Sequence, residues 1–276
     1  MAGVTLCEPT ELYNLLNQST KISRLAEPNY LCLLDARTKR EYNESHLMTA
    51  LRVKTNPLGK YLVPESINLE CVRYCVVYDG KTETLMPQIN KYFVSTLYSL
   101  NDLLVDAKEG SAARCARIMQ RLTRFPVMVL RGGYERFTTS YHYLRTQKIF
   151  WMPQELEAFK TYPVEILPAK LYMGNYKQAC DSQIQKDLKI KAHINICEED
   201  DAHIHKGAVL VFSTLGISRC STAVMAYLIH SCKLYLKVSV KCKNNIRPNR
   251  AFVKQLSDWE QRFYITAITD ISEPNY

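Results

Sequence analysis

Residues 209–228 read VLVFSTLGISRCSTAVMAYL, which predicts a strand, a short loop and a helix in succession. The apolar residues 209–211 are typical of a buried strand, and apolar positions between Ala223 and Leu228 recur at helical spacing. The loop between them contains one glycine and ends in Arg219. Such a loop directs backbone N–H groups and the positive end of the helix dipole at an anion, and an arginine adds two parallel hydrogen bonds. The stretch therefore predicts a phosphate-binding loop.

The composition is that of a globular protein with an excess of positive charge. The 276 residues are 47% hydrophobic, and 36 Lys and Arg against 27 Asp and Glu give a net charge of +9 and a pI near 9.0. Such an excess favours acidic partners such as phosphoproteins, nucleic acid or anionic lipid, although a solvated basic surface without a special partner explains it equally well.

The ten cysteines are scattered, and no pair has Cys-x-x-Cys spacing. Free thiols and an N-terminus without a leader pattern predict a reduced, intracellular protein, which we place in the cytoplasm. No apolar stretch approaches the 18 residues that a membrane span requires. His203 and His205 lie near Cys197 in the sequence, but no fourth ligand follows at a suitable spacing, so we expect no metal and no cofactor.

The first half of the chain alternates short apolar runs with helical stretches. Strands are expected at 30–36, 50–53 and 71–79, a strand with a glycine turn at 127–134, a helical turn at 38–47, and helices around 83–98 and 111–124. This order predicts an α/β fold with a doubly wound parallel sheet. Three prolines within 147–168 mark a boundary to a second domain.

Two stretches of this half, LLDARTKREYNESHLMTALRV and VMVLRGGYERF, resemble the rhodanese family. An active rhodanese carries sulfur on a cysteine at the end of the strand that corresponds to 71–79, but this strand ends in Asp79. A carboxylate cannot accept sulfane sulfur and repels an anionic donor. Cys75, within the strand, is expected to be a small buried hydrophobe. The resemblance therefore implies a rhodanese-like interaction module without activity.

The second half resembles the dual-specificity protein phosphatases over nearly all of 160–265. Four segments follow the family's order: EILPAKLYMGNYKQA, KIKAHINI, VLVFSTLGISRCSTAVMAYL and RPNRAFVKQLSDWE. An inactive rhodanese-like domain before such a domain is similar to the mitogen-activated protein kinase phosphatases, and most of all to the serine/threonine/tyrosine-interacting-like pseudophosphatases. The resemblance implies a rhodanese-like domain at 1–150, a linker at 151–163, a phosphatase-like α/β domain at 164–265 and a tail at 266–276.

The family signature His-Cys-x-x-Gly-x-x-Arg is only partly preserved. The His and Cys positions are Phe212 and Ser213, and the rest of the predicted phosphate-binding loop is Thr214, Leu215, Gly216, Ile217, Ser218 and Arg219. The reaction needs a thiolate, whose pKa a helix N-terminus lowers from about 8.5 to about 3.5–7.5, whereas a serine without a base is a weak nucleophile. Cys220 follows the arginine and is expected to be a packing residue. We therefore predict no catalytic residue in this loop.

The general acid of the family is also missing from its expected place. It is an aspartate about thirty residues before the nucleophile, but here the twelve residues 197–208 connect the strands at 189–196 and 209–212. Twelve residues span at most about 40 Å, whereas a further strand and helix need on the order of 20–30 residues. The domain is therefore expected to lack a strand, the acid loop and a helix, as after an internal deletion. Asp200 and Asp201 lie in this connector, and nothing in their spacing makes them the acid.

The leading hypothesis is an inactive pseudophosphatase that regulates or scaffolds phosphorylated proteins or protein kinases. The alternative is a kinase-docking adaptor that acts through the rhodanese-like domain, with a poorly folded C-terminal half. Only the dispersed Arg52, Lys54 and Lys60 stand where related phosphatases have a run of arginines. Specific nucleic-acid binding has no module signature behind it and ranks lower.

Overall fold

The computed structural model describes residues 3–19, 22–64, 67–85, 109–150, 152–197, 208–233, 246 and 248–264. The chain divides into two compact units. The first comprises Met1–Leu12 and Leu25–Glu157, and the second comprises Tyr13–Arg24 and Ala158–Tyr276. None of the described helices is both long and apolar enough to span a membrane.

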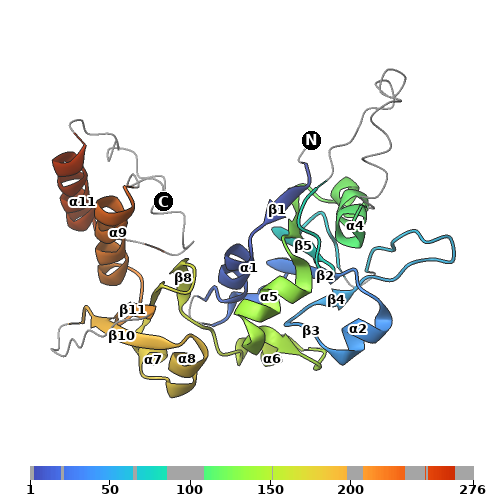
Figure 1. The fold of residues 1–276 in the computed structure, drawn as a ribbon, viewed down its shortest axis with the longest axis horizontal. Coiled ribbons are helices and arrows are strands. Elements are labelled where there is room, and N and C mark those ends of the chain that lie inside the picture. The colour runs from blue at the N-terminus through green and yellow to red at the C-terminus, as the bar shows by residue number, and fades with distance from the viewer. Residues whose placement is uncertain are drawn as a thin grey trace. The chain divides into compact units, whose positions relative to one another are not determined.

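A parallel sheet of five strands forms the centre of the first unit (Figure 1). The strands lie in the order β1, β6, β5, β2, β4, and every pair of neighbours is parallel. Their bounds are β1 Thr5–Cys7, β2 Leu31–Asp35, β4 Leu51–Arg52, β5 Tyr74–Tyr78 and β6 Val127–Leu130. The apolar runs expected to be strands are strands, and the predicted parallel α/β sheet is confirmed here.

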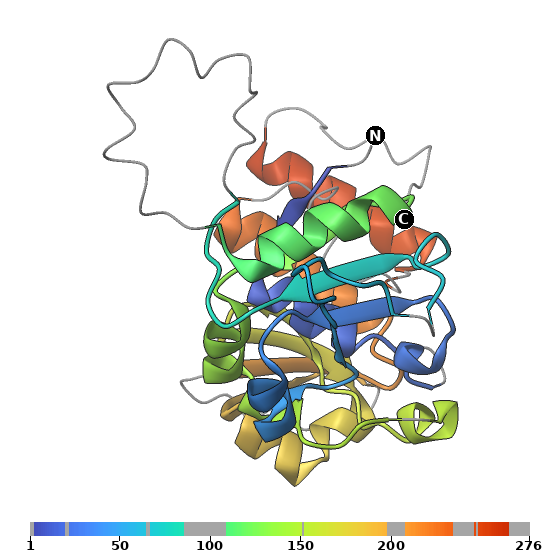
Figure 2. The ribbon, with the colours of Figure 1, turned by 90° about the vertical axis from the view of Figure 1, so that its right-hand side faces the viewer.

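The remaining elements up to residue 157 are helices and short segments. They are α1 Pro9–Leu16, η1 Arg24–Ala26, α2 Lys39–Glu44, α4 Ser111–Met119, η3 Gln120–Leu122, α5 Gly133–Ser140, η4 His142–Leu144 and α6 Pro153–Glu157, with β3 His46–Leu47 paired antiparallel to β7 Arg145–Thr146. Helix α4 packs on β5 and β6 and lies across one face of the sheet (Figure 2). The helix expected around 111–124 is thus α4 with η3, whereas the one around 83–98 lies largely outside the described residues.

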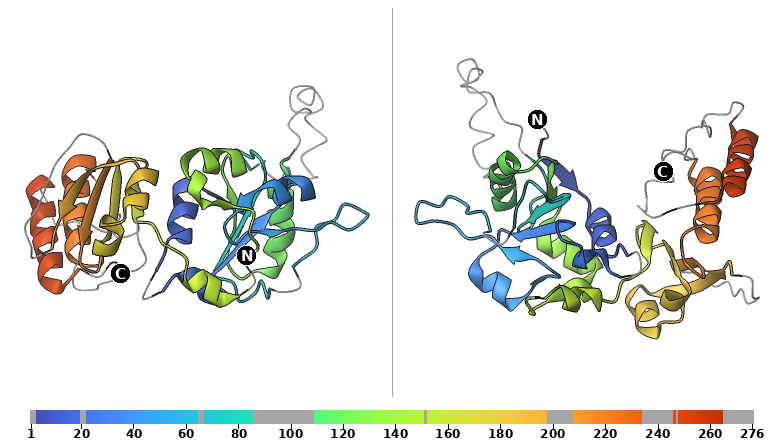
Figure 3. Two further views of the ribbon diagram at one scale, coloured as in Figure 1. Left: turned by 90° about the horizontal axis from the view of Figure 1, so that it is seen from below. Right: turned by 180° about the vertical axis from the view of Figure 1, so that it is seen from behind.

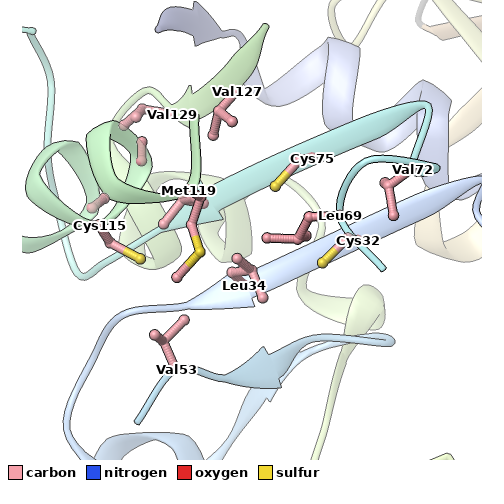
Figure 4. Close-up of a cluster of buried hydrophobic side chains, with 13 residues drawn as sticks. Cys32, Leu34, Val53, Leu69, Val72, Cys75, Cys115, Met119, Val127 and Val129 are labelled. Atoms are coloured by element: carbon pink, nitrogen blue, oxygen red, sulfur yellow. The ribbon is translucent and has the colours of Figure 1, made fainter. Parts of the chain in front are cut away.

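The core of the first unit lies between α4 and the sheet (Figure 4). Cys75 is 3% exposed and lies opposite Cys32 on the neighbouring strand, and Cys115 extends from α4 into the same cluster. These buried cysteines pack among Leu34, Met119 and other apolar side chains. Cys75 therefore has the packing environment expected of it from the sequence.

The second unit is built on a sheet of four strands, β8 Val164–Leu167, β9 Leu171–Asn175, β10 Ile190–Asn195 and β11 Ala208–Ser213. The order is β10, β11, β9, β8, and only β8 is antiparallel to its neighbour. Helices α7 Tyr176–Ala179 and α8 Ser182–Asp187 pack on one face, while α9 Arg219–Cys232 and α11 Arg250–Phe263 lie on the other (Figure 3). The sheet thus places the end of β11 directly before α9.

Residues 13–24 belong to the second unit, although the sequence places them with the first. The Tyr13 hydroxyl donates to Pro163 O at 2.7 Å, and the Asn14 side chain exchanges two hydrogen bonds with the backbone of Glu165. Asn17 Oδ1 accepts from Tyr162 N at 2.9 Å. These bonds give the backbone before and within β8 polar partners that are 145 to 151 residues away in sequence, and sequence patterns do not reveal them. The stretch 151–163, expected as a linker, contains α6.

Candidate phosphate-binding loop and the Asp79 cleft

The loop 213–219 connects the end of β11 with the start of α9. Ser213 is the last residue of β11 and lies opposite Asn175, the last residue of β9. Helix α9 begins at Arg219, so the first turn of the helix and its positive dipole end face the loop. The predicted succession of strand, loop and helix is therefore present in the structure.

Gly216 is the residue that allows the loop to turn tightly over β9. Its φ is +70°, a conformation that favours glycine, and a Cβ there would lie 2.8 Å from Gly174 O. The nearby backbone of Asn175 would lie 3.0 Å away. The glycine of the signature thus serves a close backbone approach as well as a left-handed turn.

Ser213 is buried, and its hydroxyl oxygen accepts a hydrogen bond from Gly216 N at 3.3 Å. A serine hydroxyl at this place is a neutral acceptor for a loop amide. Nothing in this contact removes its proton, which a nucleophilic serine requires. The interaction fixes the loop but does not activate the oxygen.

Phe212, the residue before Ser213, belongs to a small aromatic cluster. Its ring centroid lies 6.2 Å from that of Tyr176 on α7 and 6.2 Å from that of His193 on β10. Burial lowers the pKa of His193, so its ring tends to be neutral, and its buried Nε2 has no hydrogen-bond partner among the described residues. The sequence did not single out His193, because its closeness to Phe212 depends on the pairing of β10 with β11.

The first turn of α9 is held by hydroxyl groups. Ser221 Oγ donates to Ile217 O and to Ser218 O, both at 2.7 Å, and Thr222 Oγ1 donates to Ser218 O at 2.9 Å. The Ser218 side chain makes no capping hydrogen bond. Arg219 is half-buried. These contacts hold the backbone at the start of the helix and leave the Ser218 hydroxyl out of the helix cap.

The remaining residues of the loop differ in exposure. Thr214 and Leu215 are exposed, Leu215 at 73%, whereas Cys220 is fully buried in the core beneath α9. Thr214 Oγ1 donates to Cys197 Sγ at 3.8 Å, a thiol that the sequence did not link to the loop. Asp200 and Asp201 lie outside the described residues. Among the described residues, no cluster of three metal-ligating side chains occurs.

Asp79, directly after β5, forms a second polar centre in the first unit. Its Oδ1 accepts from Lys81 N at 3.1 Å and Thr82 N at 2.9 Å. Its Oδ2 accepts from Thr82 Oγ1 at 2.6 Å, Ser111 Oγ at 3.1 Å and Ala112 N at 3.0 Å. The carboxylate therefore caps the N-terminus of α4 and holds the turn after β5 at the same time.

Burial alone raises the pKa of Asp79, but hydrogen bonds from Thr82, Ala112 and Ser111 outweigh it and hold the pKa below its ordinary value. The carboxylate is thus ionised at neutral pH. It lies in a cleft of about 630 Å³ whose charged lining consists of Arg37, Lys81, Glu41, Asp79, Glu83, Glu109 and Glu135. The cleft around Asp79 carries more acidic than basic groups, and the correspondence of Asp79 to the sulfur-carrying cysteine of the rhodaneses stays a prediction.

Comparison with known proteins relates the chain to dual-specificity phosphatases. No protein-family model matches it. A probable rhodanese domain-containing dual specificity protein phosphatase of Dictyostelium discoideum is 24% identical over 333 residues, covering 91% of this chain and 68% of that protein. Dual specificity protein phosphatase 4 of Gallus gallus is 24% identical over 294 residues, covering 85% and 77%.

Solved structures of the same kind match part of the chain. The human tyrosine phosphatase-like serine/threonine/tyrosine-interacting protein aligns with a TM-score of 0.33 and 21% identity, covering 39% of this chain and all of that one. A leucine rich repeat and phosphatase domain containing protein from Entamoeba histolytica aligns with a TM-score of 0.33 and 16% identity, covering 37% and 92%.

Proposed function

We propose that this chain is a catalytically inactive relative of the dual-specificity phosphatases that binds phosphorylated proteins as a regulator or scaffold. The observation that carries the proposal is the loop 213–219. It keeps Gly216 in its left-handed turn and Arg219 at the start of α9, while a neutral hydroxyl stands at the position of the nucleophile.

The inactivity follows from the chemistry of two positions. The Ser213 hydroxyl accepts the Gly216 amide, and the preceding side chain is the aromatic ring of Phe212, which can neither accept a proton nor stabilise a thiolate. Loss of general acid catalysis alone lowers a rate by about 10²–10⁴-fold. A shortened connector between β10 and β11, which we attribute to an internal deletion before the loop, would remove the acid as well.

The binding of phosphate rests on the groups that surround the loop. Backbone N–H groups, the positive end of the α9 dipole and the Arg219 guanidinium attract an anion without any nucleophile. Arg219 in particular offers a planar pair of donors that matches two phosphate oxygens.

Titration of a fluorescent phosphotyrosine peptide tests the binding. We expect weak binding to the wild type, at least a tenfold loss in Arg219→Ala and incomplete recovery in Arg219→Lys. Arg250→Ala, which removes an exposed arginine at the start of α11, is the matched control and leaves the affinity unchanged. Identical curves for wild type and Arg219→Ala would contradict phosphate binding by the loop.

A phosphate-release assay with the same peptide tests the inactivity. We expect no release above that of buffer. Release that disappears in Ser213→Ala would contradict the proposal, because it would make this hydroxyl a nucleophile.

The first unit is proposed to be a rhodanese-like module without sulfurtransferase activity, because the Asp79 carboxylate is fully engaged with the turn after β5 and with α4. Cyanide-dependent thiocyanate formation from thiosulfate is the assay, and we expect none. Activity that Cys75→Ala abolishes would contradict this assignment.

A projecting hairpin in the first unit favours the kinase-docking adaptor as a second candidate. Leu62 N donates to Lys54 O at 2.8 Å and Asn56 N to Lys60 O at 2.9 Å, and Leu58 between them is 92% exposed. Leu58→Asp is expected to weaken capture of a purified mitogen-activated protein kinase, and Glu44→Asp, on the exposed side of α2, serves as the control. Equal capture of the kinase by both variants would exclude the hairpin as the docking site.

A further inference from the structure

The second unit has an apolar groove on the face of its sheet that carries α9. The groove holds about 610 Å³ and is lined by residues from four strands and one helix, among them Ile194, Val209, Val211, Ala223 and Tyr227. Two of these apolar side chains are exposed to solvent, Ile194 at 37% and Tyr227 at 49%. The groove does not include the residues of the loop 213–219.

The groove lies beside α9 because this helix covers only part of the sheet face. Helix α9 packs on β11 and β9, and its other neighbour is α11. In the described part of the chain, β10 is an edge strand of the sheet, and its Ile194 borders the groove. A parallel sheet is normally covered on both faces, mostly by helices. This strip of apolar surface can therefore accommodate one more helix.

The edge of β10 is less suited to a further strand. The pairing of β10 with β11 shifts between Ile190 and Ala192, and the residue between them is the exposed Lys191. A bulge and an edge lysine are two devices by which proteins prevent strand addition. A helix lying on the face, rather than a strand at the edge, is therefore the occupant that this geometry admits.

The lysines around the groove indicate that such a helix carries acidic side chains. Lys170 lines the groove, and Lys189 and Lys191 stand exposed at the start of β10. Val209 N donates to Lys170 O, and Ile190 pairs with Ala208, so these lysines lie at the same end of the sheet, where β9, β10 and β11 begin. A second copy of the chain, with a net charge of +9, would bring like charges to this end.

We propose that the groove binds an amphipathic helix of a partner protein, with an apolar stripe toward Ile194 and Tyr227 and acidic residues toward the lysines. Apolar contacts of a helix in a groove supply the affinity, and the lysines select an acidic partner. This site is separate from the phosphate-binding loop and does not depend on it.

Designed helical peptides of 18 residues (about five turns) serve as probes. One has a leucine stripe and glutamates elsewhere, the second has the same stripe with lysines, and the third has the glutamates with the leucines scrambled. Fluorescence anisotropy with the full chain is expected to show binding of the first, at least tenfold weaker binding of the second, and none of the third. Added salt is expected to weaken the binding of the first peptide, because it screens the attraction between its glutamates and the lysines.

Tyr227→Glu is expected to lower affinity for the acidic peptide at least tenfold and to leave the phosphopeptide titration unchanged. Leu122→Glu places the same charge at an apolar residue of the first unit that is 40% exposed. It is expected to change neither the affinity for the acidic peptide nor the phosphopeptide titration. Hydrogen exchange of α9 reports whether Tyr227→Glu is folded, and Lys191→Glu is the second variant if it is not. No binding of the acidic peptide, equal binding of all three peptides, or a dimer that Tyr227→Glu dissociates would overturn the proposal.

Discussion

Replacement of Asp79 by alanine removes the acceptor of five hydrogen bonds at once. Three of these bonds fix the turn at Lys81 and Thr82, and two come from the first residues of α4, Ser111 and Ala112. Asp79 is 6% exposed, so water cannot easily replace its carboxylate at every donor. The substitution therefore tests whether Asp79 holds the turn and the helix together.

The magnitude follows from the donors that lose their partner. The Ala112 N–H is buried, and a buried donor left without an acceptor costs about 1–3 kcal/mol. Loss of a negative charge at the N-terminus of α4 costs about 0.3–1 kcal/mol more. Lys81 and Thr82 line the cleft, so we expect water to replace the lost acceptor at their amides. We expect Asp79→Ala to lower the free energy of unfolding of the first unit by about 1–4 kcal/mol.

The effect depends on pH with a definite sign. The pKa of Asp79 is lower in the folded state than its ordinary value, so ionised Asp79 stabilises the fold above the unfolded pKa of about 3.9. This contribution is lost as the pH falls below about 4 and through the folded-state pKa. Wild type and Asp79→Asn, whose amide does not titrate, are expected to converge in stability over that range.

Hydrogen exchange at increasing urea concentration measures the two units separately. Glu44→Gln is the control, since its ion pair with Arg40 is largely exposed and such pairs contribute about 0–1 kcal/mol. A loss below about 0.5 kcal/mol in Asp79→Ala at pH 7, or a difference between wild type and Asp79→Asn that persists unchanged at pH 3, would refute this reasoning.

Three further predictions concern the second unit. Phe212→His with Ser213→Cys is expected to create a thiol of low pKa that iodoacetamide alkylates at pH 6 faster than the surface thiols; equal rates would mean that the helix N-terminus does not act on this position. Gly216→Ala is expected to cost at least about 1–2 kcal/mol, measured by urea unfolding, because its φ is +70° and its Cβ would meet backbone atoms; an unchanged midpoint would contradict this. The second unit is expected to be less stable than the first, so that β10, which has exposed apolar surface beside it, exchanges its amide hydrogens faster than β5; equal protection would contradict this.

The strands and the glycine loop could be predicted from the sequence because their signals are local. Continuous apolar runs mark the buried strands of a parallel sheet, and a loop with Gly216 before a helical pattern marks the turn into α9. The parallel order of the first sheet followed from the alternation of strands and helices. The phosphate-binding role of the loop stays a prediction.

Contacts between segments far apart in the sequence could not be predicted. The sequence showed only that the Asp79 carboxylate cannot accept sulfane sulfur. Its part in capping α4 depends on Ser111, which is 32 residues later. The sequence does contain one local signal, the Asp-Gly pair at 79–80 with Thr82 two residues after it, which is typical of a turn held by the aspartate side chain. His193 gave no such signal, because only the pairing of strands brings it to Phe212.

Asp79 and Ser213 occupy similar places in the two units, each at the end of a strand and before a helix, but they differ in charge. In each, an oxygen at the end of a central parallel strand accepts amides of the following turn: Asp79 those of Lys81 and Thr82, and Ser213 that of Gly216. Asp79 also brings a negative charge to a helix N-terminus, so the field that would attract an external anion is already neutralised there. Ser213 brings no charge, so it does not neutralise the positive dipole end at the start of α9. We therefore expect the centre at Ser213, rather than the one at Asp79, to attract an external anion.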